Sequence, residues 1–119
     1  MSFNPDEFFC HSDGTILQGG FITTMLDASM AFLVMQLVDF KKVPLSIDVN
    51  VNFLSSGGPK LTIAVARINK IGKSIAFSSA DLFQDDELIA TASSSIKLKD
   101  FESRNWIDDT IGKNVKIIR

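Results

Sequence analysis

The sequence predicts an α+β domain in which one long apolar helix packs against an antiparallel β-sheet. Three observations predict it: an apolar run over residues 20–40, an alternation of apolar and polar residues over 46–53, and short turns between the β-rich segments that follow. Helices and sheets bury their apolar faces against one another in layers, which gives this architecture. With 119 residues the chain is long enough for one core, so we expect a single domain spanning residues 1–119.

The residues ahead of the helix, 1–18, are predicted to be irregular. Two turn-forming clusters, Asn4-Pro5-Asp6 and Ser12-Asp13-Gly14, enclose the short apolar segment Phe8-Phe9-Cys10. The N-terminus lacks a basic region followed by an apolar stretch, so we expect no secretion signal. Cys10 is the only cysteine and allows no disulfide within one chain. This fits a reducing compartment, and we therefore expect a cytoplasmic protein.

The apolar run over residues 20–40 is predicted to form one helix, about 30 Å long if continuous. Lys41 and Lys42 follow it, where positive charge suits the C-terminal end of a helix dipole, and Pro44 blocks its continuation. The run is also long enough to be confused with a membrane span. Because two aspartates within it would be costly in hydrocarbon, we expect a helix at the centre of the fold and no membrane partner.

Four strands are predicted after the helix. Residues 46–53 alternate with period two, so Ile47 and Phe53 are expected on a buried face and Ser46 on the polar face. The other predicted strands cover residues 61–70, 74–84 and 88–98, with turns at 55–59, 71–73 and 85–87. Because short turns join neighbouring strands, the pairing is expected to be antiparallel. Such a sheet leaves an exposed edge, which edge-to-edge pairing of two copies would cover.

The charge balance argues against several classes of function. The formal net charge is −2, and the sequence contains neither a basic cluster that would indicate nucleic-acid binding nor an acidic tail. His11 is the only histidine, and without partner ligands it predicts no metal site. Residues 102–119 are more polar than the rest and are interpreted as a C-terminal extension.

A glycine pair at the start of the helix and an acid within the helix form the most informative motif. Gln18-Gly19-Gly20 opens the apolar run, and helix starts offer unpaired backbone N–H groups and partial positive charge. Asp27 lies about two turns further on, where we expect it to face the same pocket. An oxyanion site beside a carboxylate is what hydrolysis of an activated acyl group requires. The structural alternative is an acid that a hydroxyl or backbone group holds in the helix.

Four segments, in this order, resemble one known family. They are Gln18-Gly19-Gly20-x6-Asp27, the strand residues 45–54, the hairpin residues 71–77 and the strand residues 88–92. Together they are similar to the hotdog-fold acyl-CoA thioesterases of the PaaI-like branch, which typically read His-Gly-Gly-x6-Asp at the start of the central helix. The resemblance covers about residues 10–98, and several motifs in the right order make it more specific than any one alone.

The resemblance implies a hotdog fold, with a curved antiparallel sheet wrapped around one long central helix. The N-terminal part is shortened here, because family members usually carry an extra strand or helix before the motif. It also implies a homo-oligomer, a dimer or a dimer of dimers, with active sites at the dimer interface to which both subunits contribute. The implied activity is hydrolysis of an acyl-CoA or aryl-acyl-CoA thioester. Coenzyme A is then part of the substrate, and no cofactor is expected.

Catalytic roles carry over from the family by position. Asp27 would be the catalytic carboxylate, acting as general base on water or as nucleophile, and the backbone N–H of Gly19 would stabilise the developing oxyanion. Ser46 matches a serine that supports the attacking group. Gln18 stands where most members carry a histidine, and its amide can still donate a hydrogen bond to a thioester carbonyl.

Other positions carry over to substrate binding. The upstream asparagine of the family is matched by His11 or by Ser12, depending on which end of the motif the count starts from. The residues that match the coenzyme A-binding hairpin are Lys70, Gly72, Lys73 and Ser74. The apolar candidates for an acyl or aryl pocket are Phe21, Met25, Phe53 and Phe77.

Two other functions compete with thioester hydrolysis. A non-catalytic hotdog module that binds acyl-CoA or serves in assembly is motivated by Gln18 and by the shortened N-terminus. A hydratase of the related hotdog type is disfavoured, because those enzymes use an acid–histidine pair just inside the central helix. No histidine lies between Asp27 and Phe40.

Overall fold

The computed structural model describes residues 1–100, so the C-terminal extension predicted over 102–119 lies outside the described residues. In chain order the elements are β1 (Ser2–Phe3), the 3-10 helix η1 (Glu7–Phe9), β2 (Cys10–His11), β3 (Ile16–Leu17), α1 (Gly19–Leu37), β4 (Lys42–Phe53), β5 (Thr62–Ile71), β6 (Ile75–Gln84) and β7 (Glu87–Asp100). The predicted α+β class is confirmed, with one long helix followed by four long strands joined by short turns.

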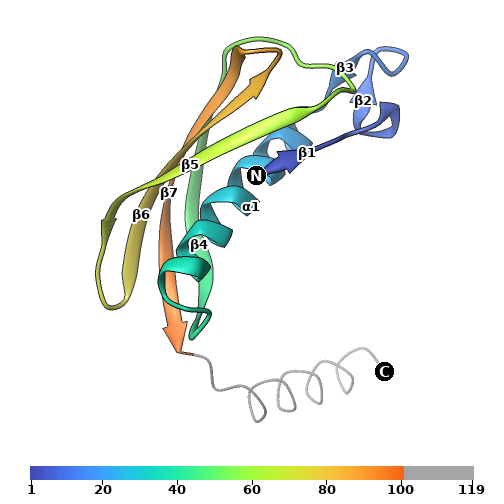
Figure 1. Ribbon diagram of the computed structural model, residues 1–119. Helices are drawn as coiled ribbons and strands as arrows, with labels where there is room; N and C mark the ends of the chain where they lie inside the picture. Colours follow the sequence, from blue (N-terminus) through green and yellow to red (C-terminus); the bar gives the residue numbers. More distant parts are fainter. Residues whose placement is uncertain (101–119) are drawn as a thin grey trace, which may run out of the picture.

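The five-stranded sheet has the order β1-β5-β6-β7-β4, and all its pairs are antiparallel. It curves around α1, which lies along its concave side (Figure 1). At one edge β1 pairs with β5 over only two residues. At the other edge the twelve-residue β4 has β7 as its partner on one side and none on the other within the described part of the chain. The predicted exposed edge is therefore β4.

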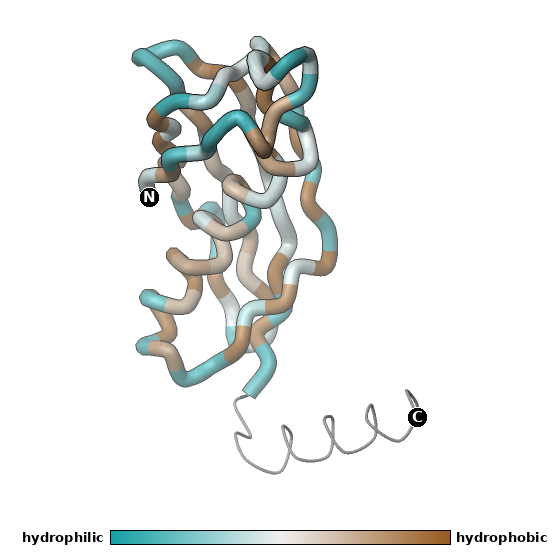
Figure 2. Tube along the Cα trace, turned by 90° about the vertical axis from the view of Figure 1, so that its right-hand side faces the viewer, coloured by the Kyte–Doolittle hydropathy of each residue, from teal (hydrophilic) through white to brown (hydrophobic). Residues whose placement is uncertain are grey.

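The core lies between α1 and the concave face of the sheet. Hydrophobic colouring predominates along α1 (Figure 2). The helix residues buried in the core are Ile22, Met25, Leu26, Ser29, Met30 and Val34. Opposite them, alanines of β6 and β7 are buried, and their small side chains let the helix approach the sheet closely. By length and composition alone α1 would suffice to cross a membrane, but the core helix of a layered fold has the same features.

Three sequence-based boundaries were wrong. Residues 1–18 are not irregular: β1 joins the sheet, where Met1 and Ala64 exchange two hydrogen bonds of 3.0 and 2.9 Å, and β2 pairs with β3. The helix ends at Leu37 rather than at residue 40, because the next residues turn into a left-handed conformation. The first long strand then starts at Lys42 and contains Pro44, which is tolerated because β4 is an edge strand.

A buried glutamine fixes the segment that follows β4. The Gln84 side chain is 3% exposed. Its Oε1 accepts the Gly58 N–H at 3.0 Å, and its Nε2 donates to the Gly58 carbonyl at 3.0 Å and to the Thr62 hydroxyl at 2.8 Å. On the other side of this segment, Leu17 donates its N–H to the Gly57 carbonyl at 2.8 Å. The turn after β4 is thus tied to the sheet and to the strand that leads into α1.

Replacing Gln84 by leucine is expected to lower the free energy of unfolding by about 2 kcal/mol or more. The change leaves the half-buried Gly58 N–H without its acceptor and the buried Thr62 hydroxyl without the amide donor of Gln84, whereas the Gly58 carbonyl keeps the Lys60 N–H at 3.0 Å. An unmet buried group costs about 1–3 kcal/mol. Urea unfolding followed by circular dichroism measures the effect. Gln36→Leu, on the exposed side of α1, is the matched control and is expected to shift stability by no more than about 0.5 kcal/mol. Equal midpoints for the two variants would contradict the assigned role of Gln84.

Candidate active site

A carboxylate of the helix and a serine of the edge strand meet at the side of α1 that faces β4. The Ser46 hydroxyl donates a hydrogen bond of 2.6 Å to Oδ1 of Asp27. Asp27 is half-buried, and Ser46 is exposed. One carboxylate oxygen is thereby held in place, and the other has no partner within residues 1–100. Asp27 therefore carries an oriented acceptor at the surface of the single chain.

A β-bulge in β4 brings Ser46 onto this face. The register shifts between Ser46 and Asp48, so that Ser46 lies opposite Ile96 and Val49 lies opposite Ser94. Ile96 and Ser94 both lie on the buried face of β7, and directly paired residues share a face. Ser46 and Val49 therefore both face the helix, although strict alternation would separate them. The prediction of Ser46 on the polar face and Ile47 on the buried face was wrong: Ile47, at the bulge, is 60% exposed.

The start of α1 presents free backbone donors. Gln18 is the N-cap residue in an extended conformation, and its side chain makes no capping hydrogen bond. The N–H groups of Gly19 and Gly20 have no acceptor among residues 1–100. A Cβ atom on Gly19 would lie 3.2 Å from Cζ of Phe53, so the glycine allows the phenyl ring to approach the helix start. These donors are what an oxyanion at this end of the helix would bind.

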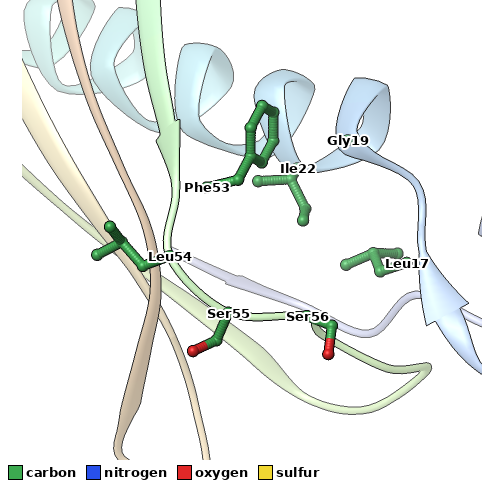
Figure 3. A pocket seen from close by; sticks show the side chains of 7 residues that line it. All are labelled: Leu17, Gly19, Ile22, Phe53, Leu54, Ser55 and Ser56. Atoms are coloured by element: carbon green, nitrogen blue, oxygen red, sulfur yellow. The ribbon is translucent and has the colours of Figure 1, made fainter.

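An open pocket of about 410 Å³ lies beside these donors. Figure 3 shows Phe53 close to the first turns of α1, with Leu54, Ser55 and Ser56 on the segment that leaves β4. The lining residues are Leu17, Gly19, Ile22, Phe53, Leu54, Ser55 and Ser56. Sequence reasoning had treated Ser55 and Ser56 only as turn residues. Nothing in their local pattern shows that the turn closes on the helix start.

Asp27 is not among the residues that line this pocket, so within one chain it does not face the same pocket as Gly19. Eight residues separate the two positions. At 1.5 Å of rise per residue, their backbones lie about 12 Å apart along the helix axis. A single thioester carbonyl needs its oxyanion donor and its attacking water within about 3 Å of the reacting atoms. Within one chain, Gly19 and Asp27 therefore do not lie within reach of the same carbonyl group.

The other predicted substrate-binding residues fall into two places. His11 and Ser12 lie at the β2–β3 hairpin ahead of α1, where His11 Nδ1 and the Ser12 hydroxyl are 2.9 Å apart, and both are exposed. Neither is hydrogen-bonded to Gln18, Gly19 or Asp27.

The residues Lys70, Gly72, Lys73 and Ser74 belong to the β5–β6 hairpin, at the end of the sheet far from the start of α1 (Figure 1). The carbonyl of Lys73 accepts a hydrogen bond of 2.7 Å from Nζ of Lys42, which ties this hairpin to the start of β4. Lys42 had been assigned only to the end of the helix.

The four apolar candidates for an acyl pocket also separate. Phe53 lines the pocket beside Gly19. Phe21 and Met25 line a different cavity on another side of α1. Phe77 pairs with Lys70 and Ser95 on the convex face of the sheet and is exposed. Within residues 1–100, no group of three or more histidine, cysteine, aspartate or glutamate side chains is placed to hold a metal ion.

The sequence model of the thioesterase superfamily matches residues 14–91, which is more than half of the chain. The chain belongs to the thioesterase superfamily. The match includes the helix start, Asp27, Ser46 and the β5–β6 hairpin. No protein with a curated function matches the sequence.

Solved structures of thioesterase relatives share the fold. One is a phenylacetic acid degradation-related protein from Ralstonia eutropha JMP134 that carries the provisional name of a thioesterase; the TM-score is 0.76 at 25% identity, over 81% of this chain and 72% of that one. A Bacillus halodurans protein solved with CoA has a TM-score of 0.75 and 19% sequence identity, over 82% of this chain and 64% of that one. Zebra fish thioesterase superfamily member 2 has a TM-score of 0.72 and 22% sequence identity, over 82% of this chain and 71% of that one. The curved sheet around one helix is thus the hotdog fold of these proteins, as the sequence predicted.

Proposed function

We propose that this protein hydrolyses acyl-CoA thioesters. The observation that carries the proposal is the hydrogen bond from Ser46 to Asp27 on a superfamily member's central helix. A carboxylate with one oxygen fixed and the other free accepts a proton from water in a defined direction. With water as the attacking group, Asp27 is the general base and Ser46 the residue that orients it.

The oxyanion that forms when water attacks the thioester carbon needs donors that already point at it. The unpaired N–H groups at the start of α1 meet this need, because the helix dipole adds partial positive charge there. Gln18, at the N-cap, has a free amide that can donate to the same oxygen. Gly19 and Gln18 are thus assigned to the oxyanion site.

The complete site requires two copies of the chain. Asp27 and Gly19 are too far apart along one helix to act on the same carbonyl group. Ser46, the hydrogen-bond partner of Asp27, lies on the unpaired edge strand β4. A two-fold axis pairs two β4 edges antiparallel, so that the end of β4 in one copy lies near its start in the other. This arrangement covers the exposed edge and brings the Asp27 side of one helix toward the helix start of the second copy. We therefore propose a homodimer with two shared sites.

The coenzyme A moiety is assigned to the β5–β6 hairpin. Lys70 and Lys73 supply positive charge for the phosphates of coenzyme A, and Lys42 holds the hairpin against β4. In the antiparallel dimer this hairpin lies near the pocket of the second copy, since both adjoin the ends of β4. The neighbour from Bacillus halodurans, solved with CoA, supports a coenzyme A thioester as substrate.

Free-thiol release from short, long and aryl acyl-CoAs tests the proposed function. We expect hydrolysis of at least one substrate by the purified protein, and Ser46→Ala to reduce kcat about tenfold because Asp27 loses its orienting donor. Ser95→Ala, on the convex face of the sheet, is the matched control and is expected to keep full activity. Binding of acyl-CoA without any release would overturn the proposal and favour the non-catalytic module, for which the unusual Gln18 is the motivating feature.

A further inference from the structure

A second cavity flanks the start of α1 on the side away from the pocket of Figure 3. It measures about 370 Å³ and is lined by Phe3, Asn4, Pro5, Phe9, Phe21, Thr24 and Met25. The N-terminal segment forms one wall and the helix the other. Phe9 packs edge-on against Phe21, with ring centroids 4.5 Å apart. The N-terminal part, although short, therefore forms an open apolar cavity with the helix.

The wall of this cavity is tied to the residue that precedes the proposed oxyanion donors. Gln18 donates its backbone N–H to the carbonyl of Phe9 at 2.9 Å, which ties the cavity wall to the N-cap of α1. Gly19 and Ile22 face the pocket with Ser55 and Ser56, whereas Phe21 and Met25 face the apolar cavity. Gly19, at the helix start, thus lines the pocket that contains the two serines, and Phe21, two residues further on, lines the apolar cavity.

The two spaces differ in what they can hold. A thioester carbonyl bound at the helix start has an acyl group on one side and a pantetheine arm with two amides on the other. The hydroxyls of Ser55 and Ser56 offer partners for amides, and in the antiparallel β4 dimer this pocket leads toward the Lys42-anchored hairpin of the second copy. The apolar cavity offers only Asn4 and Thr24 as polar side chains, and the Thr24 hydroxyl already donates to the Gly20 carbonyl at 2.9 Å.

We propose that the cavity beneath the N-terminal segment holds the acyl group, and that the substrates are uncharged apolar acyl-CoAs of medium chain length or with an aryl end. The assignment rests on the proposed function and adds to it the direction in which the substrate lies. A volume of about 370 Å³ falls in the range of small-molecule sites. No charged side chain lines the cavity, so an acyl group that ends in a carboxylate lacks a partner there and is rejected.

Binding of non-hydrolysable thioether analogues tests the assignment without hydrolysis. Calorimetry compares S-butyl-CoA, S-octyl-CoA and an S-octyl-CoA whose chain ends in a carboxylate. Each buried methylene contributes a factor of about four, so the octyl analogue, with four more methylenes, is expected to bind about two-hundredfold more tightly than the butyl one. The carboxylate-ended analogue is expected to lose most of that gain. Equal affinities for butyl and octyl chains in the wild-type protein would overturn the proposal.

Two variants locate the chain in this cavity. Asn4→Trp fills it from an exposed position and is expected to reduce the octyl-to-butyl ratio below tenfold, whereas Asn69→Trp, an exposed position on β5, keeps the wild-type ratio. Phe9→Ala removes a wall and is expected to reduce the ratio similarly. The adjacent Phe8, 86% exposed and outside the cavity, gives the control Phe8→Ala.

The outcomes separate the two proposals. Circular dichroism establishes that each variant is folded. An unchanged octyl-to-butyl ratio in both Asn4→Trp and Phe9→Ala would overturn the acyl-site assignment, whatever the hydrolysis rates. Chain-length-dependent binding that these variants abolish would support the assignment even if the wild-type protein released no thiol, a result that counts only against the proposed function.

Discussion

Replacing Asp27 by asparagine is expected to lower kcat for acyl-CoA hydrolysis by a factor of about 10²–10⁴ while the fold stays intact. The amide has the size of the carboxylate, and its oxygen can still accept the 2.6 Å hydrogen bond from Ser46. It cannot take a proton from water at neutral pH. Thiol release from the best acyl-CoA substrate measures the loss.

Asp39→Asn is the matched control for this variant. Asp39 is exposed beyond the C-terminal end of α1 and has a φ of 54°, a left-handed conformation that asparagine tolerates as readily as aspartate. The control is expected to keep full activity and an unchanged unfolding midpoint. If Asp27→Asn hydrolysed acyl-CoA at the wild-type rate, Asp27 would not be the general base. The structural alternative, an acid held only by the Ser46 hydroxyl, would then explain its place in the helix.

The long elements could be predicted because their patterns are local. The apolar run of α1, the alternation in β4 and the short turns between strands each lie within a few residues of sequence, and each predicted an element that the structure contains. The position of Ser46 depends on a bulge, which inserts one residue into the strand and leaves no trace in a period-two pattern. The same pattern that identified the strand therefore placed its most interesting side chain on the wrong face.

The candidate residues could be named from the sequence, but their positions relative to one another within one chain could not. The glycine pair and Asp27 were identified from the motif, yet about 12 Å of helix separates them within one chain, and the proposed dimer is needed to bring them together. The walls of both cavities come from segments far apart in the chain, as when Phe9 meets Phe21 or Phe53 meets Gly19. Contacts of this kind depend on how the turns and the N-terminal segment fold back.

The second large effect is expected for Gly19→Pro, which is predicted to lower kcat for acyl-CoA hydrolysis. Proline removes the N–H assigned to the oxyanion site, and losing one such donor is expected to lower kcat by about 10²–10³. Proline suits the first position of a helix, and Gln18 already has the extended conformation that a following proline requires, with φ −67° and ψ 141°. Gly19→Ala is the matched control, because it introduces the same Cβ contact with Phe53 but keeps the N–H.

Mixing the two inactive proteins then tests whether a site draws on two copies. A mixed dimer of Asp27→Asn and Gly19→Pro chains has one site with both defects and one site with neither. Random assortment makes half of the dimers mixed, so co-expressed chains are expected to recover about a quarter of the wild-type activity. Co-expression of Asp27→Asn with Ser46→Ala is the control: both changes affect the acid half, so every site of a mixed dimer keeps one defect. If the co-expressed chains were no more active than the average of the two variants measured separately, the proposal of a shared site would be contradicted. Gly19 and Asp27 of one chain would then act in the same site, or Gly19 would lie outside the site.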